Sequence, residues 1–252
     1  MMRFILVGMI ILFMNSILLA SYEEALELYK TKKYSDSLKL IANELFVAKD
    51  MEPNSPNYKL RYLAAHNHWK IGSYNSAIFH FKRCAEIMKT SIDPLLDISL
   101  LLVEIKRYAE AERIATRALK LQKNAFLYLI LGKCSFGYSQ YFRAKKMFET
   151  SISIDPELYI AYNNLGITLM KLKKYSEANT AFSAALAIAP NNSRVINNIG
   201  LSLEKEGDYK KAYTTLKRAS TINPKNSAII KNLNRLKRKL EKNKIKNYDV
   251  SE

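Results

Sequence analysis

The three histidines and two cysteines are the side chains of this sequence best suited to bind a metal ion or act as nucleophiles. His66 and His68 form a His-x-His pair, but residues two apart on a helix point to different faces and do not chelate one ion together. The sequence assigns no carboxylate partner to His80. Cys84 and Cys134 lie fifty residues apart with no Cys-x-x-Cys spacing, which argues against a zinc site and against a disulfide framework. We therefore predict no metal site.

The sequence also lacks the common catalytic motifs. It has no glycine-rich phosphate loop, no Gly-x-Ser-x-Gly elbow and no His-Glu-x-x-His. We therefore predict a protein that has no catalytic residues and no cofactor, and that is not an enzyme.

The composition favours helices and an anionic partner. Only 7 Gly and 6 Pro occur in 252 residues, too few to punctuate many strands and turns. Hydrophobic residues make up 48% of the chain and charged residues 25%, so a core can form. The formal net charge of +17 attracts phospholipid, wall polymer, nucleic acid or acidic protein, without selecting among them.

The first twenty residues have the pattern of an export signal. Arg3 precedes an apolar run from Phe4 to Leu19, and Ala20 offers a small residue for cleavage. The run is a little shorter than the roughly 20 apolar residues that span a bilayer. A cleaved signal peptide, an uncleaved N-terminal membrane anchor, and a misleading start or buried helix are the alternatives for this pattern. Either of the first two predicts an exported bacterial protein that is periplasmic, or membrane-anchored and facing away from the cytoplasm.

A period of 34 residues runs through the rest of the chain. Pro156, Pro190 and Pro224 are each 34 residues apart, and a fixed period of this size is the mark of a repeat architecture. The seventeenth place of every repeat is a tyrosine: Tyr34, Tyr74, Tyr108, Tyr141, Tyr175 and Tyr209. Small residues recur at the eighth, twentieth and twenty-seventh places, as Gly166 and Ala178 do in the fifth repeat. Small side chains there allow two antiparallel helices to approach closely.

This register resembles the tetratricopeptide-repeat family over residues 21 to about 246. The resemblance implies an all-α fold, a right-handed superhelical solenoid of about six helix-turn-helix repeats and a C-terminal capping helix, in which each repeat is stabilised by its neighbours. The turns are expected near Gly72, Lys106, Ser139, Lys173 and Gly207. A Ser-x-x-Glu capping box at Ser21 and Glu24 predicts the start of the first helix. The expected organisation is a signal peptide or anchor at 1–20, an irregular first repeat and long loop at 21–57, five repeats over 58–226 (58–91, 92–124, 125–158, 159–192, 193–226), a basic capping helix at 227–246 and a disordered tail at 247–252.

In the family, the first helices of successive repeats line a concave groove that binds a peptide. Carrying the groove places over by register implies these peptide-binding residues: Tyr62, His66, Trp69, Phe126, Lys133, Asn163, Asn164, Arg194, Asn197, Asn198 and Asn232. Trp69 is the only tryptophan, and aromatic residues are favoured anchors of binding surfaces. The alternative for Trp69 is packing under the preceding repeat.

Asparagines at the sixth place of successive repeats suggest one kind of ligand contact. Asn164, Asn198 and Asn232 are 34 residues apart and resemble the asparagine ladder of the O-linked N-acetylglucosamine transferase superhelix, whose amides hold peptide backbone. The alternative is that they follow the family consensus without binding anything. The carboxylate clamp of chaperone-binding members has Lys and Asn where this chain has Tyr62 and His66, so that ligand class is not indicated.

Two functions follow from these patterns. The first is a non-catalytic scaffold of the cell envelope that binds a protein or peptide partner in the groove. The second is a surface-associated binder of anionic membrane or another polyanion, through the basic stretch of the capping helix between Lys231 and Lys246. Nucleic acid is disfavoured because no aromatic residues interleave with these charges. The alternative is that the basic stretch is a solvated helix face with no binding role.

Overall fold

The computed structural model describes residues 19–47 and 56–242, which form helices and turns and no strand. The predictions for residues 1–18, for most of the long loop and for the C-terminal tail lie outside these residues. A first helix occupies residues 19–30. The others are α2 (Tyr34–Val47), α3 (Pro56–Lys70), α4 (Tyr74–Ile87), α5 (Asp93–Glu104), α6 (Tyr108–Leu119), α7 (Ala125–Gly137), α8 (Tyr141–Ile154), α9 (Tyr159–Lys171), α10 (Tyr175–Ile188), α11 (Ser193–Glu206), α12 (Tyr209–Ile222) and α13 (Ser227–Lys242).

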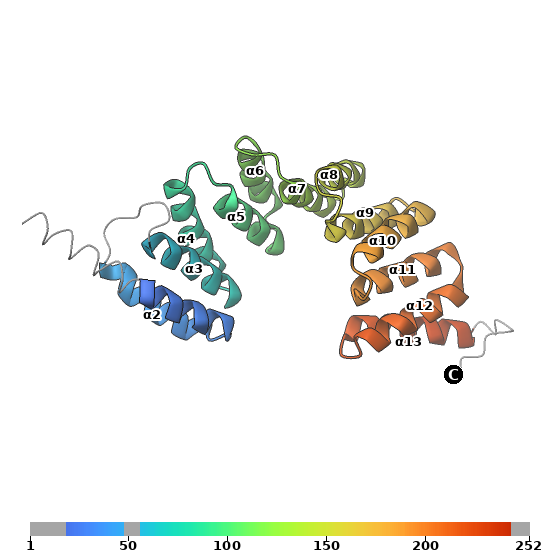
Figure 1. The fold of residues 1–252 in the computed structure, drawn as a ribbon. Coiled ribbons are helices and arrows are strands. Elements are labelled where there is room, and N and C mark those ends of the chain that lie inside the picture. Colours follow the sequence, from blue (N-terminus) through green and yellow to red (C-terminus); the bar gives the residue numbers. More distant parts are fainter. Residues whose placement is uncertain (1–18, 48–55, 243–252) are drawn as a thin grey trace, which may run out of the picture. The chain divides into compact units, whose positions relative to one another are not determined.

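The chain divides into two compact units, Met1–Lys123 and Asn124–Glu252. Unit 1 contains the helix of residues 19–30 and α2 to α6, and unit 2 contains α7 to α13. Within each unit the helices pack in the order of the sequence, each against the next (Figure 1). Each unit is thus a solenoid of antiparallel helix pairs, which confirms the predicted fold class.

Each helix pair turns at one residue with a left-handed backbone. The φ angles are 83° at Gly72, 61° at Lys106, 59° at Ser139, 61° at Lys173 and 96° at Gly207, the five places predicted for the turns. The N–H of the next residue bonds to the carbonyl five residues earlier, as in the 2.9 Å bond from Lys174 N to Leu169 O. This is the Schellman motif, which satisfies carbonyls left open at the end of a helix. The same turn geometry therefore closes every pair, with or without glycine.

The small residues of the repeat lie where the paired helices approach most closely. Ser37, Ala77, Ala111, Ala144, Ala178 and Ala212, at the twentieth place, are all fully buried. At the eighth place, a Cβ added to Gly166 would lie 2.5 Å from Cε1 of Phe182, so the phenylalanine ring occupies the space that the glycine leaves. The predicted alternation of small and large residues is confirmed. It follows that each pair is held by shape as well as by apolar burial.

The prediction for the first helix is wrong in its starting residue. Residues 19 and 20 are already helical, so Ser21 lies inside the helix and does not cap it with Glu24. The Ser21 hydroxyl instead donates a hydrogen bond to Glu44 Oε1 on α2, at 3.1 Å. A Ser-x-x-Glu match is short, and inside a helix the same spacing places both side chains on one face.

Helix α13 closes the solenoid of unit 2, as the predicted capping helix should. Its Leu236 and Leu240 are buried against Ala212 and Leu216 of α12. An ion pair joins it to α11, where two 2.6 Å hydrogen bonds run from the Arg235 guanidinium to the two carboxylate oxygens of Glu204.

Candidate functional site

Aromatic side chains and two carboxylates gather where α3 meets α5 in unit 1. The Tyr62 hydroxyl donates a hydrogen bond to Asp97 Oδ2, and His66 Nε2 lies 3.4 Å from the same oxygen. Burial, together with the charge of Asp97 and this hydrogen bond, raises the pKa of Tyr62. The Tyr62 and His66 rings meet edge to face, with centroids 4.9 Å apart. Two of the predicted groove residues are thereby fixed on one carboxylate.

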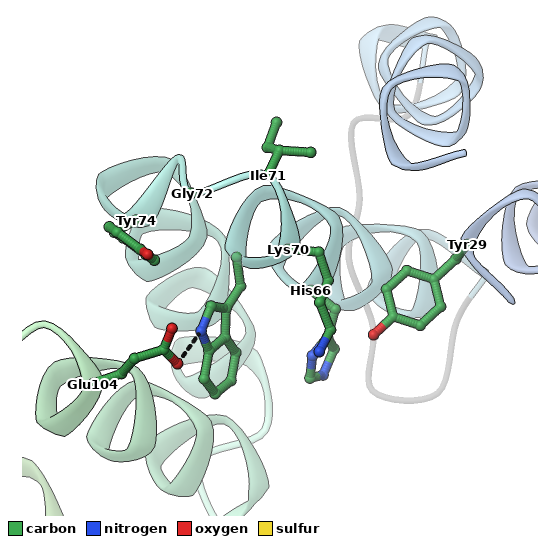
Figure 2. Close-up of a pocket in the computed structure, with 8 residues that line it drawn as sticks. Tyr29, His66, Lys70, Ile71, Gly72, Tyr74 and Glu104 are labelled. Carbon is green, nitrogen blue, oxygen red and sulfur yellow. Dashed lines mark hydrogen bonds between the residues drawn. The ribbon is translucent and has the colours of Figure 1, made fainter. Parts of the chain in front are cut away.

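Trp69 continues this cluster toward the end of α3. Its indole Nε1 donates a 2.9 Å hydrogen bond to Glu104 Oε2 on α5, shown as a dashed line in Figure 2. Its ring stacks on His66, with centroids 6.2 Å apart and planes 13° apart. The tryptophan therefore packs on its own helix and reaches forward to the following repeat.

A recess of about 590 Å³ opens beside Trp69, and we call it the aromatic recess (Figure 2). Its lining residues are Tyr29, His66, Trp69, Lys70, Ile71, Gly72, Tyr74 and Glu104. In Figure 2, Glu104 and Tyr29 lie on opposite sides of His66, while the Ile71 side chain points away from all three. Two of the predicted groove residues, His66 and Trp69, thus line this recess together.

The other two histidines form a pair inside the α3–α4 hairpin. His68 and His80 stack with ring centroids 5.3 Å apart and planes 12° apart. The Nδ1 atoms of both rings are buried, with no hydrogen-bond partner among the described residues. Burial lowers the pKa of His68; for His80, burial and the neighbouring His68 and Arg61 lower the pKa to about 4. His68 therefore points into the hairpin, whereas His66 lines the aromatic recess.

We expect this pair to make the protein less stable in mild acid. Above pH 6.5, the ordinary histidine pKa, His80 is neutral in both the folded and the unfolded chain. Between pH 6.5 and about 4 the unfolded chain binds a proton that the folded protein does not, so the free energy of unfolding falls as the pH falls. The loss should be about 1 kcal/mol at pH 5, allowing for the solvent that reaches His80. Urea unfolding of the wild type and of His80→Phe at pH 7.5 and pH 5.0 measures it. An equal pH dependence in both proteins would contradict the assignment.

A second recess, of about 310 Å³, lies on the first helices of unit 2, and we call it the amide recess. Its lining residues are Lys133, Tyr159, Ile160, Asn163, Asn164, Asn192, Arg194 and Val195. Burial lowers the pKa of Lys133, with which no acidic side chain of the described residues pairs. Four of the predicted groove residues meet here: Lys133, Asn163, Asn164 and Arg194. Phe126 of α7 does not line the recess but is 37% exposed.

The asparagines of the predicted ladder bond to the chain itself. Asn164 Nδ2 donates to the carbonyl of Ile160 at 2.7 Å. Asn198 Nδ2 donates to Asn163 Oδ1 at 2.9 Å, and Asn232 Nδ2 donates to Asn197 Oδ1 at 3.0 Å. Each amide nitrogen that the resemblance offered to a ligand backbone therefore donates one hydrogen bond within the chain, and two of these bonds join α9 to α11 and α11 to α13.

Replacing Asn198 and Asn232 by alanine together should therefore cost stability. Each substitution removes one interhelical hydrogen bond worth about 0.5–1.5 kcal/mol, so we expect a loss of about 1–3 kcal/mol in the free energy of unfolding. Asn75→Ala is the control, because Asn75 is exposed on α4 and its side chain makes no hydrogen bond with the described residues. Urea denaturation measures both. A double variant as stable as the wild type would show that these amides are not structural.

The contacts between successive first helices follow one rule. Tyr62 and Asp97, Trp69 and Glu104, and both asparagine pairs are all 35 residues apart. Because the period is 34 residues, a residue at one place of a repeat contacts the residue one place further along in the following repeat. By register Asp97 and Glu104 also occupy groove places, in the third repeat, but the sequence analysis did not pair them with Tyr62 and Trp69. The 35-residue spacing was the signal that could have shown this pairing.

The described residues hold no constellation for metal or membrane insertion. Residues 19–47 and 56–242 contain no group of three or more His, Cys, Asp or Glu that would hold a metal ion. Over the same ranges, every helix is too short or too polar to cross a bilayer. Both cysteines are buried.

Stacked helix pairs with a 34-residue period define the class of helical-repeat proteins, which act through extended surfaces. Tetratricopeptide-repeat models match residues 58–88, 159–192 and 193–226. These residues therefore form tetratricopeptide repeats, which are typically found in non-catalytic scaffolds. No curated protein sequence matches it significantly.

Solved structures of the same fold include the APC/C hetero-tetramer Cut9–Hcn1, with a TM-score of 0.72 and 18% identity over 87% of this chain and 42% of that one. The present chain thus spans less than half of that relative. PilW, a type IV pilus biogenesis factor, matches with a TM-score of 0.72 and 17% identity over 88% of this chain and 99% of its own. YrrB, a tetratricopeptide protein with an unusual peptide-binding site, matches with a TM-score of 0.53 and 18% identity over 68% and 89%. At these identities the likeness concerns the fold alone.

Proposed function

We propose that the chain is a scaffold of the cell envelope that binds a segment of a partner protein on the first helices of its repeats. The aromatic and amide recesses carry this proposal, because each unit has a concave surface on its first helices that is lined mainly by aromatic and polar side chains. Small concave sites with a few placed polar groups are the usual binding sites of proteins. YrrB, which shares this fold, has an unusual peptide-binding site, and this is consistent with the proposal.

Site-specific photo-cross-linking tests the binding face. A benzophenone amino acid replaces Phe126 on α7 or Arg194 on α11, both first helices, and Phe142 on α8 as the control, which is a second helix with 76% of the side chain exposed. The proposal expects one partner, identified by mass spectrometry, to be cross-linked from both first-helix positions and not from Phe142. Cross-links that form only from Phe142, or different proteins at every position, would refute it.

The envelope location rests on the sequence of residues 1–20. A C-terminally tagged full chain should fractionate with the periplasm or the membrane, and the mass of its N-terminal peptide separates cleavage after Ala20 from an intact anchor. Recovery of the intact chain from the cytosol alone would contradict export.

The basic-surface alternative draws on the charges that α13 leaves unpaired. Glu204 holds Arg235 and lies 3.6 Å from Lys239, whereas Lys231 and Arg238 are exposed. Binding of the full chain to vesicles of anionic lipid tests this function, since binding of this kind weakens steeply as salt rises. Salt-independent capture of the cross-linked partner would favour the groove.

A further inference from the structure

Helix α5 carries charges opposite in sign to those of the chain as a whole. The chain has a formal net charge of +17, yet the charged residues of α5 are Asp93, Asp97 and Glu104, with no basic residue among them. Asp97 is already engaged by Tyr62 and His66. Glu104 is exposed and accepts only the Trp69 N–H, and no basic side chain of the described residues pairs with it. One carboxylate therefore stands at the aromatic recess with its charge uncompensated.

The rest of the recess offers aromatic surface. His66 and Trp69 are stacked, Tyr29 approaches His66 edge-on with centroids 6.4 Å apart, and Tyr74 lines the same recess. An aromatic face attracts a cation, and a guanidinium group can stack flat on it while pairing with a carboxylate through two parallel hydrogen bonds. Ring surface and an unpaired carboxylate in one concavity are complementary to a planar cation.

We propose that the aromatic recess takes an arginine side chain of the partner segment, with its guanidinium against the Trp69 and Tyr74 rings and paired with Glu104. This inference rests on the proposed function and names the chemistry of the partner. Arginine fits better than lysine because its charge is planar, more weakly hydrated and able to make the bidentate contact. The volume of about 590 Å³ exceeds one side chain and leaves room for the flanking backbone.

Lys70 is the only lysine or arginine that lines the aromatic recess, and its position determines where an incoming guanidinium group binds. It follows Trp69 on α3 and is exposed, whereas Glu104 approaches from α5 (Figure 2). An incoming guanidinium is repelled by Lys70 and attracted by Glu104. The cation is therefore expected to bind at the α5 side, and Lys70→Met should strengthen its binding about 2- to 5-fold.

Tryptophan fluorescence tests the proposal directly, because Trp69 is the only tryptophan of the chain. The probe is the blocked peptide acetyl-Gly-Arg-Gly-amide, titrated into the full chain at fixed ionic strength. We expect a saturable change in Trp69 emission. The same peptide with citrulline, which keeps the shape and loses the charge, should bind at least 10-fold more weakly. No saturable response, or an equal response to citrulline, would overturn the proposal.

Two matched variants complete the experiment. Glu104→Gln keeps an acceptor for the Trp69 N–H and removes the charge, so affinity for the arginine peptide should fall at least 10-fold. Glu110→Gln lies on α6, where Glu110 pairs with Arg107, and should bind like the wild type. Unchanged affinity in Glu104→Gln would overturn the site, as would tetramethylammonium binding as tightly as the arginine peptide.

The outcome is separable from that of the proposed function. The cross-linking positions Phe126 and Arg194 belong to unit 2, whereas the arginine probe reports on unit 1. A cross-linked partner without arginine binding removes only the arginine site. Arginine binding without any cross-linked partner removes the first-helix scaffold function and keeps the site.

Discussion

Replacing Phe182 by alanine is expected to lower the free energy of unfolding by about 3–5 kcal/mol. The Phe182 side chain is fully buried, in one cluster with Ala178, Leu169 and Val195. Its ring occupies the space left by the missing Cβ of Gly166. The loss has two contributions. Folding no longer buries the apolar surface of the ring, and the helix pair does not close the cavity that the ring leaves behind. Urea denaturation followed by circular dichroism measures it.

Phe142→Ala is the matched control for this prediction. Phe142 lies on α8 of the same unit and is 76% exposed, so the same substitution should change stability by no more than about 0.5 kcal/mol. Equal losses in the two variants would mean that Phe182 does not fill the interior of its helix pair.

Replacing Arg235 by leucine should cost about 2–3 kcal/mol and release α13 first. Glu204 is 7% exposed, and removal of Arg235 leaves its buried carboxylate with only the more distant Lys239 ammonium, 3.6 Å away, as a counter-charge. We expect less than the full 3–5 kcal/mol typical of buried pairs, because the Arg235 side chain is itself 48% exposed. Urea denaturation gives the total, and hydrogen exchange in α13 shows where the loss occurs. Protection in α13 equal to that of the wild type would contradict this.

Two further variants and the pH dependence check the physical reason. Arg83→Leu breaks an exposed pair with Glu86 and should change stability by less than about 0.5 kcal/mol. Glu204→Leu combined with Arg235→Leu should recover most of the loss. Burial alone raises the pKa of Glu204, but the hydrogen bonds and charge of Arg235 outweigh it and lower that pKa. The pair therefore stabilises the fold above the ordinary glutamate pKa of 4.5, and this contribution disappears as the pH falls through the lower folded-state value.

Much of the fold could be predicted because the same structural requirement recurs at the same place of each repeat. A small residue at the twentieth place appears six times, from Ser37 to Ala212, and each copy is buried. A turn that needs a left-handed residue also recurs, so Lys106 and Lys173 were placed by register although neither is glycine. The helix start at Ser21 was mispredicted because it rested on one short match without a second copy.

The candidate site was harder to predict. Every repeat has the same groove places, whereas the hydrogen-bond partner of a groove residue lies in the neighbouring repeat. The sequence placed Trp69 on a first helix but assigned it no acceptor, and Glu104 supplies one from the next repeat. The sequence placed the asparagines on the first helices but did not indicate their bonds to the preceding helix, since a sixth-place amide can face a ligand or that helix. The period alone does not distinguish the two.

The sequence by itself determined the helix pairs, their turns and the residues at which they touch, since these depend on side-chain size within one repeat and on a period copied along the chain. Only the tertiary structure decided which polar groups remain for a ligand. Hydrogen bonds form between repeats with an offset of one place, which engages one N–H of Asn198 and one of Asn232 and leaves the Glu104 carboxylate without a counter-charge. That offset comes from how one helix pair stacks on the next, a packing result that no single repeat encodes.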